Sequence, residues 1–225
     1  SHQKIQYILQ NIQKKTISFR KLPIYNKKPM SLRKGIGFCQ QSEIGSDFLF
    51  FRKRYIMTIL GFLQGKEKDN KGRYLFDYWE ADNQWLEETH NYIQWMFPLD
   101  KRSFHHPFVA PALKEYELEM AKQDEIIQYN MIMSFQRMLE FYGLRLNEVE
   151  NKIEKNNSFE ERSKVWLVVK NHNHLRLTRI IKSLRLFGLE TYAEMLLDFL
   201  IELVSEVDCF TKITRSIWME LKIRK

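Results

Sequence analysis

The sequence has few of the residues that would indicate a disulfide framework, a turn-rich β fold or a membrane span. Only Cys39 and Cys209 are cysteines, too few for several bridges, so we expect a reducing, intracellular, cytoplasmic location. Eight glycines and five prolines argue against an all-β sandwich or barrel. The longest apolar run, residues 55–63, is far shorter than the ~18 residues of a transmembrane segment. No secretory signal is expected either.

What the chain does have is a large apolar fraction and an uneven distribution of charge. Hydrophobic residues make up 44% of its 225 residues, enough to bury a substantial core. The formal net charge is +8. Residues 1–54 hold twelve basic residues against Glu43 and Asp47, a net charge of +10, which leaves −2 for the remainder. The sequence therefore predicts a near-neutral body preceded by a basic arm.

Residues 1–46 are predicted to form this arm, as a short amphipathic helix followed by a linker rich in proline and glycine. Two interpretations remain open: a solvated lead-in, or a surface for nucleic acid or an anionic membrane formed by residues 4–34. The candidate anion-binding residues are Lys14, Lys15, Arg20, Lys21, Lys27, Lys28, Arg33 and Lys34.

Residues 47–225 are predicted to form a single compact multi-helix domain, and the fold class is all-α. Apolar residues recur there at helical spacing. The expected helices cover residues 47–63, 84–97, 113–122, 124–142, 159–187 with a break near Asn171, 190–207 and 211–223. Residues 74–79 fit either a strand or the start of a helix. Residues 98–112 are expected to be a lid or binding loop, and residues 147–157 a polar insertion between helices.

The segment His172–Glu190 carries the most informative pattern. On a helix with about 100° per residue, His172, Arg176, Arg179 and Ser183 share one stripe that apolar residues flank on both sides. A buried guanidinium needs a carboxylate, carbonyl or phosphate partner. The two arginines therefore either tie this helix to acidic groups on a neighbour or line a pocket for an anionic or peptide ligand.

A second segment, His90–Leu99, is rich in aromatic residues. With Glu87 it would place a His–Gln–Glu row on one helix face, beside Trp95. This row could line a cleft, or His90 could be a core histidine bonded to a carbonyl. Glu87 is also a candidate partner for the arginines. The candidate ligand-binding residues from both segments are His90, Gln94, Trp95, His172, Asn173, Arg176, Arg179 and Ser183.

Motifs for catalysis are missing from the sequence. There is no phosphate-binding glycine loop, and His105-His106 lacks cysteine or carboxylate partners at metal-ligand spacing. We therefore expect no catalytic residue, no cofactor and no metal. An enzyme that acts on a phosphorylated or nucleotide-like ligand, with His90 or His172 as acid or base, remains the alternative.

Three stretches resemble the conserved domain of the opioid growth factor receptor family. They are HNYIQWMFPL (His90–Leu99), FYGLRL (Phe141–Leu146) and HNHLRLTRIIKSLRLFGLE (His172–Glu190). Weaker similarity extends the match over about residues 55–205. Arg185 stands where the family usually has a second glycine. The compact chain, rich in lysine and isoleucine, looks most like a microbial-type single-domain relative.

This resemblance implies a non-enzymatic receptor-like domain that binds an opioid peptide and belongs to a growth-regulatory signalling family unrelated to seven-helix receptors. A peptide or protein ligand is the implied partner, with nuclear or membrane association in the cell. The resemblance implies no known reaction and assigns no ligand-binding residue.

Overall fold

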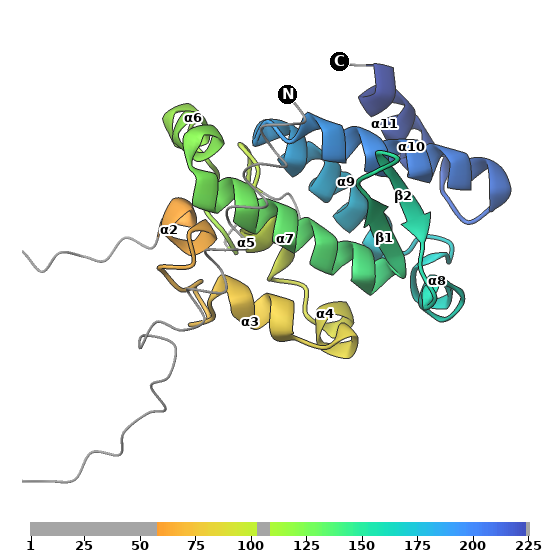
Figure 1. Cartoon of the computed structure of the whole chain (residues 1–225). Coiled ribbons are helices and arrows are strands. Elements are labelled where there is room, and N and C mark those ends of the chain that lie inside the picture. The colour runs from red at the N-terminus through yellow and green to blue at the C-terminus, as the bar shows by residue number, and fades with distance from the viewer. Residues whose placement is uncertain (1–57, 103–108, 224–225) are drawn as a thin grey trace, which may run out of the picture. The chain divides into compact units, whose positions relative to one another are not determined.

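The computed structural model describes residues 58–102 and 109–223 (Figure 1). The chain divides into the units Ser1–Arg54 and Tyr55–Lys225, and every described residue belongs to the second unit. The basic arm with its candidate anion-binding residues therefore lies outside the described residues, as does His105-His106. The domain boundary expected near residue 47 stays a prediction.

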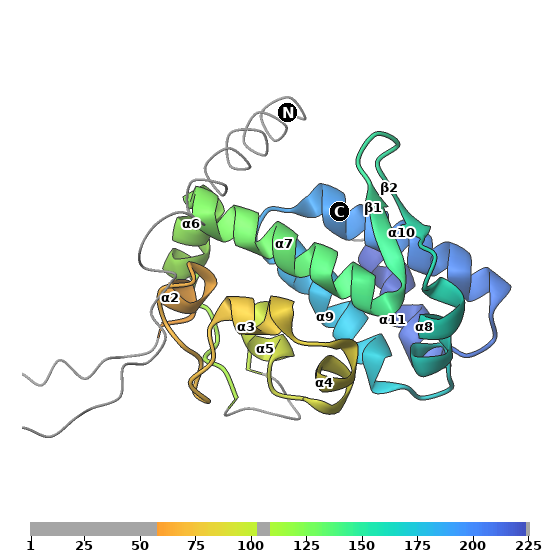
Figure 2. The ribbon, with the colours of Figure 1, turned by 60° about the horizontal axis from the view of Figure 1, so that its bottom comes forward.

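Ten helices and one two-stranded sheet make up the described part, and the all-α prediction is confirmed. In chain order the elements are α2 (Ile59–Leu63), α3 (Leu75–Glu80), α4 (Asn83–Glu88), α5 (Ile93–Met96), α6 (Glu115–Gln123), α7 (Glu125–Tyr142), β1 (Leu144–Asn147), β2 (Lys152–Lys155), α8 (Phe159–Trp166), α9 (His172–Leu186), α10 (Glu190–Glu206) and α11 (Lys212–Ile223). Helix α7 runs between α3 and α4 on one side and α9 and α10 on the other (Figures 1 and 2). None of the described helices has the length and apolar character needed to cross a membrane.

Polar caps set the ends of the long helices. The Asp124 carboxylate accepts the amide hydrogens of Ile126 and Ile127 at the start of α7, which satisfies donors that a helix leaves unpaired. Gly143 ends the same helix with a φ of 76°, a left-handed conformation that glycine adopts at little cost. Asn171 caps α9 through a bond from the amide of Asn173. The break predicted near Asn171 is therefore confirmed.

The core is rich in large aromatic side chains whose polar atoms are paired. Trp95, Trp166 and Trp218 are almost completely buried. Their indole N–H groups donate to the Val109 carbonyl at 2.7 Å, the Tyr142 carbonyl at 3.1 Å and the Thr178 hydroxyl at 2.9 Å, respectively. A buried indole without a partner would be destabilising, so these bonds let the rings contribute their full apolar area to the core.

The continuous helix predicted over residues 84–97 is wrong. The chain leaves the helical conformation at Thr89, where φ is −86° and ψ is 122°, and forms the single turn of α5 afterwards. The Thr89 carbonyl accepts a hydrogen bond from Arg176, so a tertiary contact replaces helical continuity here. The predicted row on one helix face is consequently broken, because His90 is exposed while Gln94 is buried.

The polar insertion predicted between helices over residues 147–157 lies between α7 and α8, and it contributes most of a β-hairpin that the sequence did not indicate. Strands β1 and β2 pair antiparallel, with Leu144 opposite Lys155 and Asn147 opposite Lys152. Ile153 is buried and anchors the hairpin to the core. A four-residue strand with one buried apolar side chain is too short for its alternation to stand out in the sequence.

Two smaller predictions concern the first described helices. Of the helix expected over residues 47–63, the described part is α2, which starts at Ile59 after Thr58, whose side chain accepts the amide hydrogen of Gly61. Residues 47–57 lie outside the described residues. Residues 75–80 form α3, so the helical alternative for that aromatic segment is correct.

Candidate functional site

Arg176 joins α9 to the C-terminal end of α4. Its Nη1 donates to the carbonyl of Leu86 at 2.9 Å and to Oδ1 of Asn173 at 3.2 Å. Its Nη2 donates to the carbonyls of Glu87 at 3.2 Å and Thr89 at 3.0 Å. The Glu87 carboxylate is farther away, 3.8 Å from Nη1. Buried Arg176 therefore ties the two segments together chiefly through backbone carbonyls rather than through acidic groups.

A small polar cluster surrounds the Glu87 carboxylate at the edge of this joint. Asn173 Nδ2 donates to Glu87 Oε2 at 3.0 Å, and His172 Nε2 lies 3.4 Å from Oε1. The rings of His90 and His172 are 5.1 Å apart. Burial and the positive charge of Arg176 lower the pKa of His172 more than Glu87 raises it. His172 is thus predominantly neutral at pH 7.

Arg179 and Ser183 continue the stripe along α9. The Ser183 hydroxyl donates to the carbonyl of Pro98 at 2.8 Å, and Arg179 Nε donates to the carbonyl of Phe97 at 2.8 Å. Among the described residues, no group accepts a hydrogen bond from either terminal nitrogen of Arg179, and no carboxylate pairs with it. Burial lowers the pKa of Arg179 to about 10, so the group stays charged at neutral pH.

Gln94 and Trp95 are part of the core rather than of an open surface. Trp95 is 1% exposed and Gln94 is 5% exposed. Gln94 makes no hydrogen bond through Oε1 to any residue that the structure describes. The structure therefore brings His90, His172, Asn173 and Arg176 together and leaves these two side chains apart from them.

The three stretches that resemble one family meet around this joint. The Tyr92 ring lies 5.4 Å from the guanidinium of Arg176. From the second stretch, the Tyr142 hydroxyl lies 3.5 Å from Oδ1 of Asn173 in the third, and burial raises the pKa of Tyr142 well above its ordinary value. Polar residues of all three stretches are thus used to hold the fold together.

Asp69 is a buried carboxylate that the sequence patterns did not single out. It accepts hydrogen bonds from Arg73 Nε at 2.8 Å and from the Tyr78 hydroxyl at 2.7 Å. Burial acts to raise its pKa, but the bonds from Arg73 and Tyr78 lower it on balance. Arg73 also donates to Asn91 at 2.8 Å. The sequence Asn70-Lys71-Gly72 indicates a turn. An aspartate directly before such a turn often accepts hydrogen bonds from it, so Asp69 could have been recognised as a structural carboxylate.

Groups that could hold a metal are absent from the described ranges, where no cluster of three or more histidine, cysteine or carboxylate side chains is suitably placed. The two histidines and Glu87 do not form such a site. The alternative of an enzyme would need His90 or His172 to act on a ligand beside Arg176, whose donors are already bonded to the chain's own oxygens.

The fold and the arginine joint define a helical domain whose signature residues are mainly internal. In a comparison with protein families, the model described as "Opioid growth factor receptor (OGFr) conserved region" matches residues 66–217. The chain therefore belongs to the opioid growth factor receptor family, and the resemblance seen in the sequence is confirmed.

Curated relatives carry the same name. The mouse (Mus musculus) opioid growth factor receptor-like protein 1 is 34% identical over 123 residues, which are 55% of this chain and 26% of the relative. The human (Homo sapiens) opioid growth factor receptor is 34% identical over 125 residues, 55% of this chain and 18% of the relative. The chain thus matches only about a quarter or less of the length of these relatives. No solved structure matches the chain.

Proposed function

We propose that this chain is a non-enzymatic binding domain that holds a peptide or protein ligand through an anionic group at Arg179. The proposal rests on the two terminal nitrogens of Arg179. Within the described part of the chain, this side chain donates a hydrogen bond only through Nε. A partly buried guanidinium is stabilised when a carboxylate replaces lost water. Arg176 serves as the contrast, because its donors are bonded to its own chain.

The family supports a peptide as the ligand. One curated relative is named opioid growth factor receptor and another opioid growth factor receptor-like protein 1, and a peptide with a free C-terminus carries a carboxylate to which Arg179 could donate. His90 is exposed and His172 is half-buried, and both remain candidates for further contacts. The other candidates would position the site rather than contact the ligand. They are Gln94, Trp95, Asn173 and Ser183.

The direct test is a fluorescence-anisotropy titration of the full chain with a labelled opioid pentapeptide. We expect saturable binding that weakens by about tenfold or more in Arg179→Gln, since a charge-assisted bidentate contact is lost. The same peptide with an amidated C-terminus should bind the unaltered chain equally weakly. Combining the amide with Arg179→Gln should cost nothing further, because both changes remove the same contact.

Arg145→Gln is the matched control, because Arg145 is exposed and pairs with Glu154. This variant should bind the peptide as the unaltered chain does. Thermal unfolding of Arg179→Gln checks that the lost bond to Phe97 leaves the domain folded. If Arg179→Gln is folded and binds both the free and the amidated peptide normally, or if the peptide does not bind at all, the proposal is wrong.

The basic arm favours a second candidate function. Its net charge of +10 within residues 1–54 would attract a polyanion, and we propose nucleic acid, with an anionic membrane surface as the competing outcome. The body of the chain carries no comparable excess of positive charge, so the two functions would use separate parts of the sequence.

For the compartment, we propose an intracellular protein with nuclear or membrane association, as the family resemblance implies. Cys209 is a free, buried cysteine in the described range, which is consistent with a reducing environment.

A further inference from the structure

The outer edge of β2 has no neighbouring strand in the described part of the chain. The Asn156 amide donates to the Gly143 carbonyl at 2.9 Å, which fixes the alternation of the antiparallel ladder from Leu144–Lys155 onward. Glu154 and Lys152 therefore bond to β1, while the amides and carbonyls of Ile153 and Lys155 point to the opposite edge. Within the described chain, no backbone group bonds to that edge.

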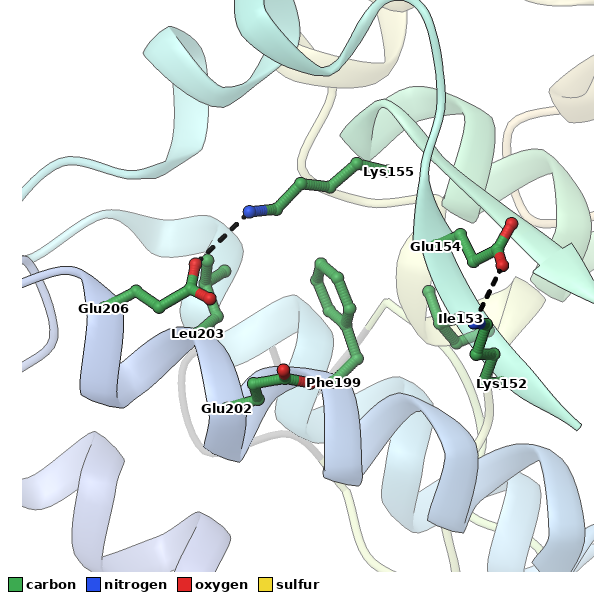
Figure 3. A pocket seen from close by; sticks show the side chains of 8 residues that line it. All are labelled: Lys152, Ile153, Glu154, Lys155, Phe199, Glu202, Leu203 and Glu206. Atoms are coloured by element: carbon green, nitrogen blue, oxygen red, sulfur yellow. Dashed lines mark hydrogen bonds and ion pairs between the residues drawn. The ribbon is translucent and has the colours of Figure 1, made fainter. Parts of the chain in front are cut away.

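A groove follows this edge between β2 and α10. Its volume is about 270 Å³, and its floor contains Phe199 and Leu203 of α10. Figure 3 shows the Phe199 ring rising from α10 into the space between Lys155 and Ile153. Phe199 is only half-buried, so part of its ring forms an accessible apolar surface beside backbone groups that have no partner in the described chain. This combination is what β-strand addition requires: main-chain bonds for affinity and a pocket for a side chain.

The charges that line the groove are paired with one exception. Lys155 lies 3.2 Å from Glu206 across the groove, and Lys152 lies 3.2 Å from Glu154. These pairs weaken the repulsion by which edge lysines discourage strand pairing. The exposed carboxylate of Glu202 makes no ion pair or hydrogen bond with any residue of the described part. An incoming chain with a positive group next to an apolar side chain would complement it.

We propose that the groove between β2 and α10 binds an extended segment of a partner polypeptide as a third strand. The segment bonds to the backbone of Ile153 and Lys155, places an aromatic or aliphatic side chain against Phe199, and sets a lysine or arginine at Glu202. The joint around Arg176 takes no part, and the surface is separate from the ligand contact proposed at Arg179.

The experiment uses a labelled heptapeptide of alternating valine and threonine, with one phenylalanine followed by one lysine, and the full chain. A second peptide carries glutamate in place of the lysine. Two further versions of the first peptide are N-methylated, one on the amides that would face β2 and one on the amides that would face away. Binding is measured by anisotropy with the unaltered chain and with Glu202→Lys, an exposed substitution whose folding is checked by thermal unfolding.

The lysine peptide should bind the unaltered chain about three- to tenfold more tightly than the glutamate peptide, as expected for a partly exposed charge contact. This preference should reverse with Glu202→Lys, a result that mere structural damage would not produce. N-methylation on the β2 side should abolish binding, while N-methylation on the other side should leave it intact.

Two results would overturn the proposal for the groove while leaving the proposed ligand contact at Arg179 unaffected. The first is no binding of the heptapeptide at millimolar concentration. The second is binding that ignores both the charge exchange and the side of N-methylation. The opioid pentapeptide titration with Arg179→Gln reports on the other surface, so failure of either proposal can be recognised separately.

Discussion

Arg176 Nη1 donates a 2.9 Å hydrogen bond to the carbonyl of Leu86, a residue 90 positions earlier in the sequence. This bond explains how the two longest family stretches can be polar and still lie inside the domain. The guanidinium bonds carbonyls of the last turn and C-cap of α4, which a helix leaves without partners of its own. Because an unpaired buried carbonyl is costly, the end of α4 and the arginine of α9 stabilise each other.

Gly143 is expected to be essential for the turn from α7 into β1. Its φ is +76°, and a Cβ there would lie 2.7 Å from the Phe159 Cα. Gly143→Ala should therefore lower the free energy of unfolding by about 2–4 kcal/mol, from backbone strain and a clash with main chain that cannot move aside. Urea denaturation measures this change.

Gly72→Ala provides the matched control for that substitution. Gly72 has a φ of +80°, but a Cβ there would meet no atom within 4 Å. Only the backbone strain remains, so the loss should be about 1 kcal/mol. Equal losses at the two positions would show that the contact with Phe159 does not matter.

Acid should weaken the domain through the buried His174 and, to a lesser extent, the half-buried His172. Burial lowers the pKa of His174 more than its bond to the Trp166 carbonyl raises it, and the pKa of His172 is lowered too. Below the unfolded pKa of about 6.5 the unfolded chain takes up protons first. Stability is therefore complete above that pH and decreases as the pH falls toward the folded pKa values, by at most about 1.4 kcal/mol per pH unit for His174. The share of His172 is smaller, because its side chain is 38% exposed and solvent screens its charge.

His174→Gln removes one of these two titrating groups. The free energy of unfolding, measured between pH 7 and pH 5, should then decrease less steeply than in the unaltered chain. An identical slope in the variant would show that His174 does not carry its share of the pH dependence.

The arm should give salt-dependent binding to a fluorescent DNA duplex if the second candidate function holds. Replacing four arm residues by glutamine should reduce the slope of log affinity against log salt by about 3–4, because each lost phosphate contact removes about one. The arm substitutions are at Lys14, Lys15, Arg20 and Lys21, and the control substitutions are at the exposed body residues Lys66, Lys68, Lys71 and Lys164. Equal effects of the two sets would rule out a role specific to the arm.

The sequence predicted the parts of this domain that depend on local periodicity. The stripe on α9 and the break at Asn171 follow from helical spacing and a capping side chain. The break at Thr89 was not predicted, because the side chain that bonds its carbonyl, Arg176, is distant in the sequence. The open edge at Ile153 was missed for a related reason: a strand of four residues shows its pairing only in three dimensions.

The sequence predicted residues that gather at the candidate site, but not which of them hold the fold and which are free to bind a ligand. The sequence could say that the arginines need oxygen partners, yet it could not say which oxygens. Arg176 has carbonyls for partners, whereas Arg179 keeps its terminal nitrogens uncommitted among the described residues. The two side chains lie on one stripe, three residues apart, and only the surrounding backbone distinguishes them.

The central claim, that Arg176 holds the fold rather than a ligand, is tested most directly by the stability of Arg176→Lys. An ammonium group cannot reach the carbonyls of Leu86, Glu87 and Thr89 in the way that the planar guanidinium does. The free energy of unfolding from urea denaturation should therefore decrease by about 2–4 kcal/mol. A stability within about 0.5 kcal/mol of the unaltered chain, together with a loss of peptide binding, would contradict the claim.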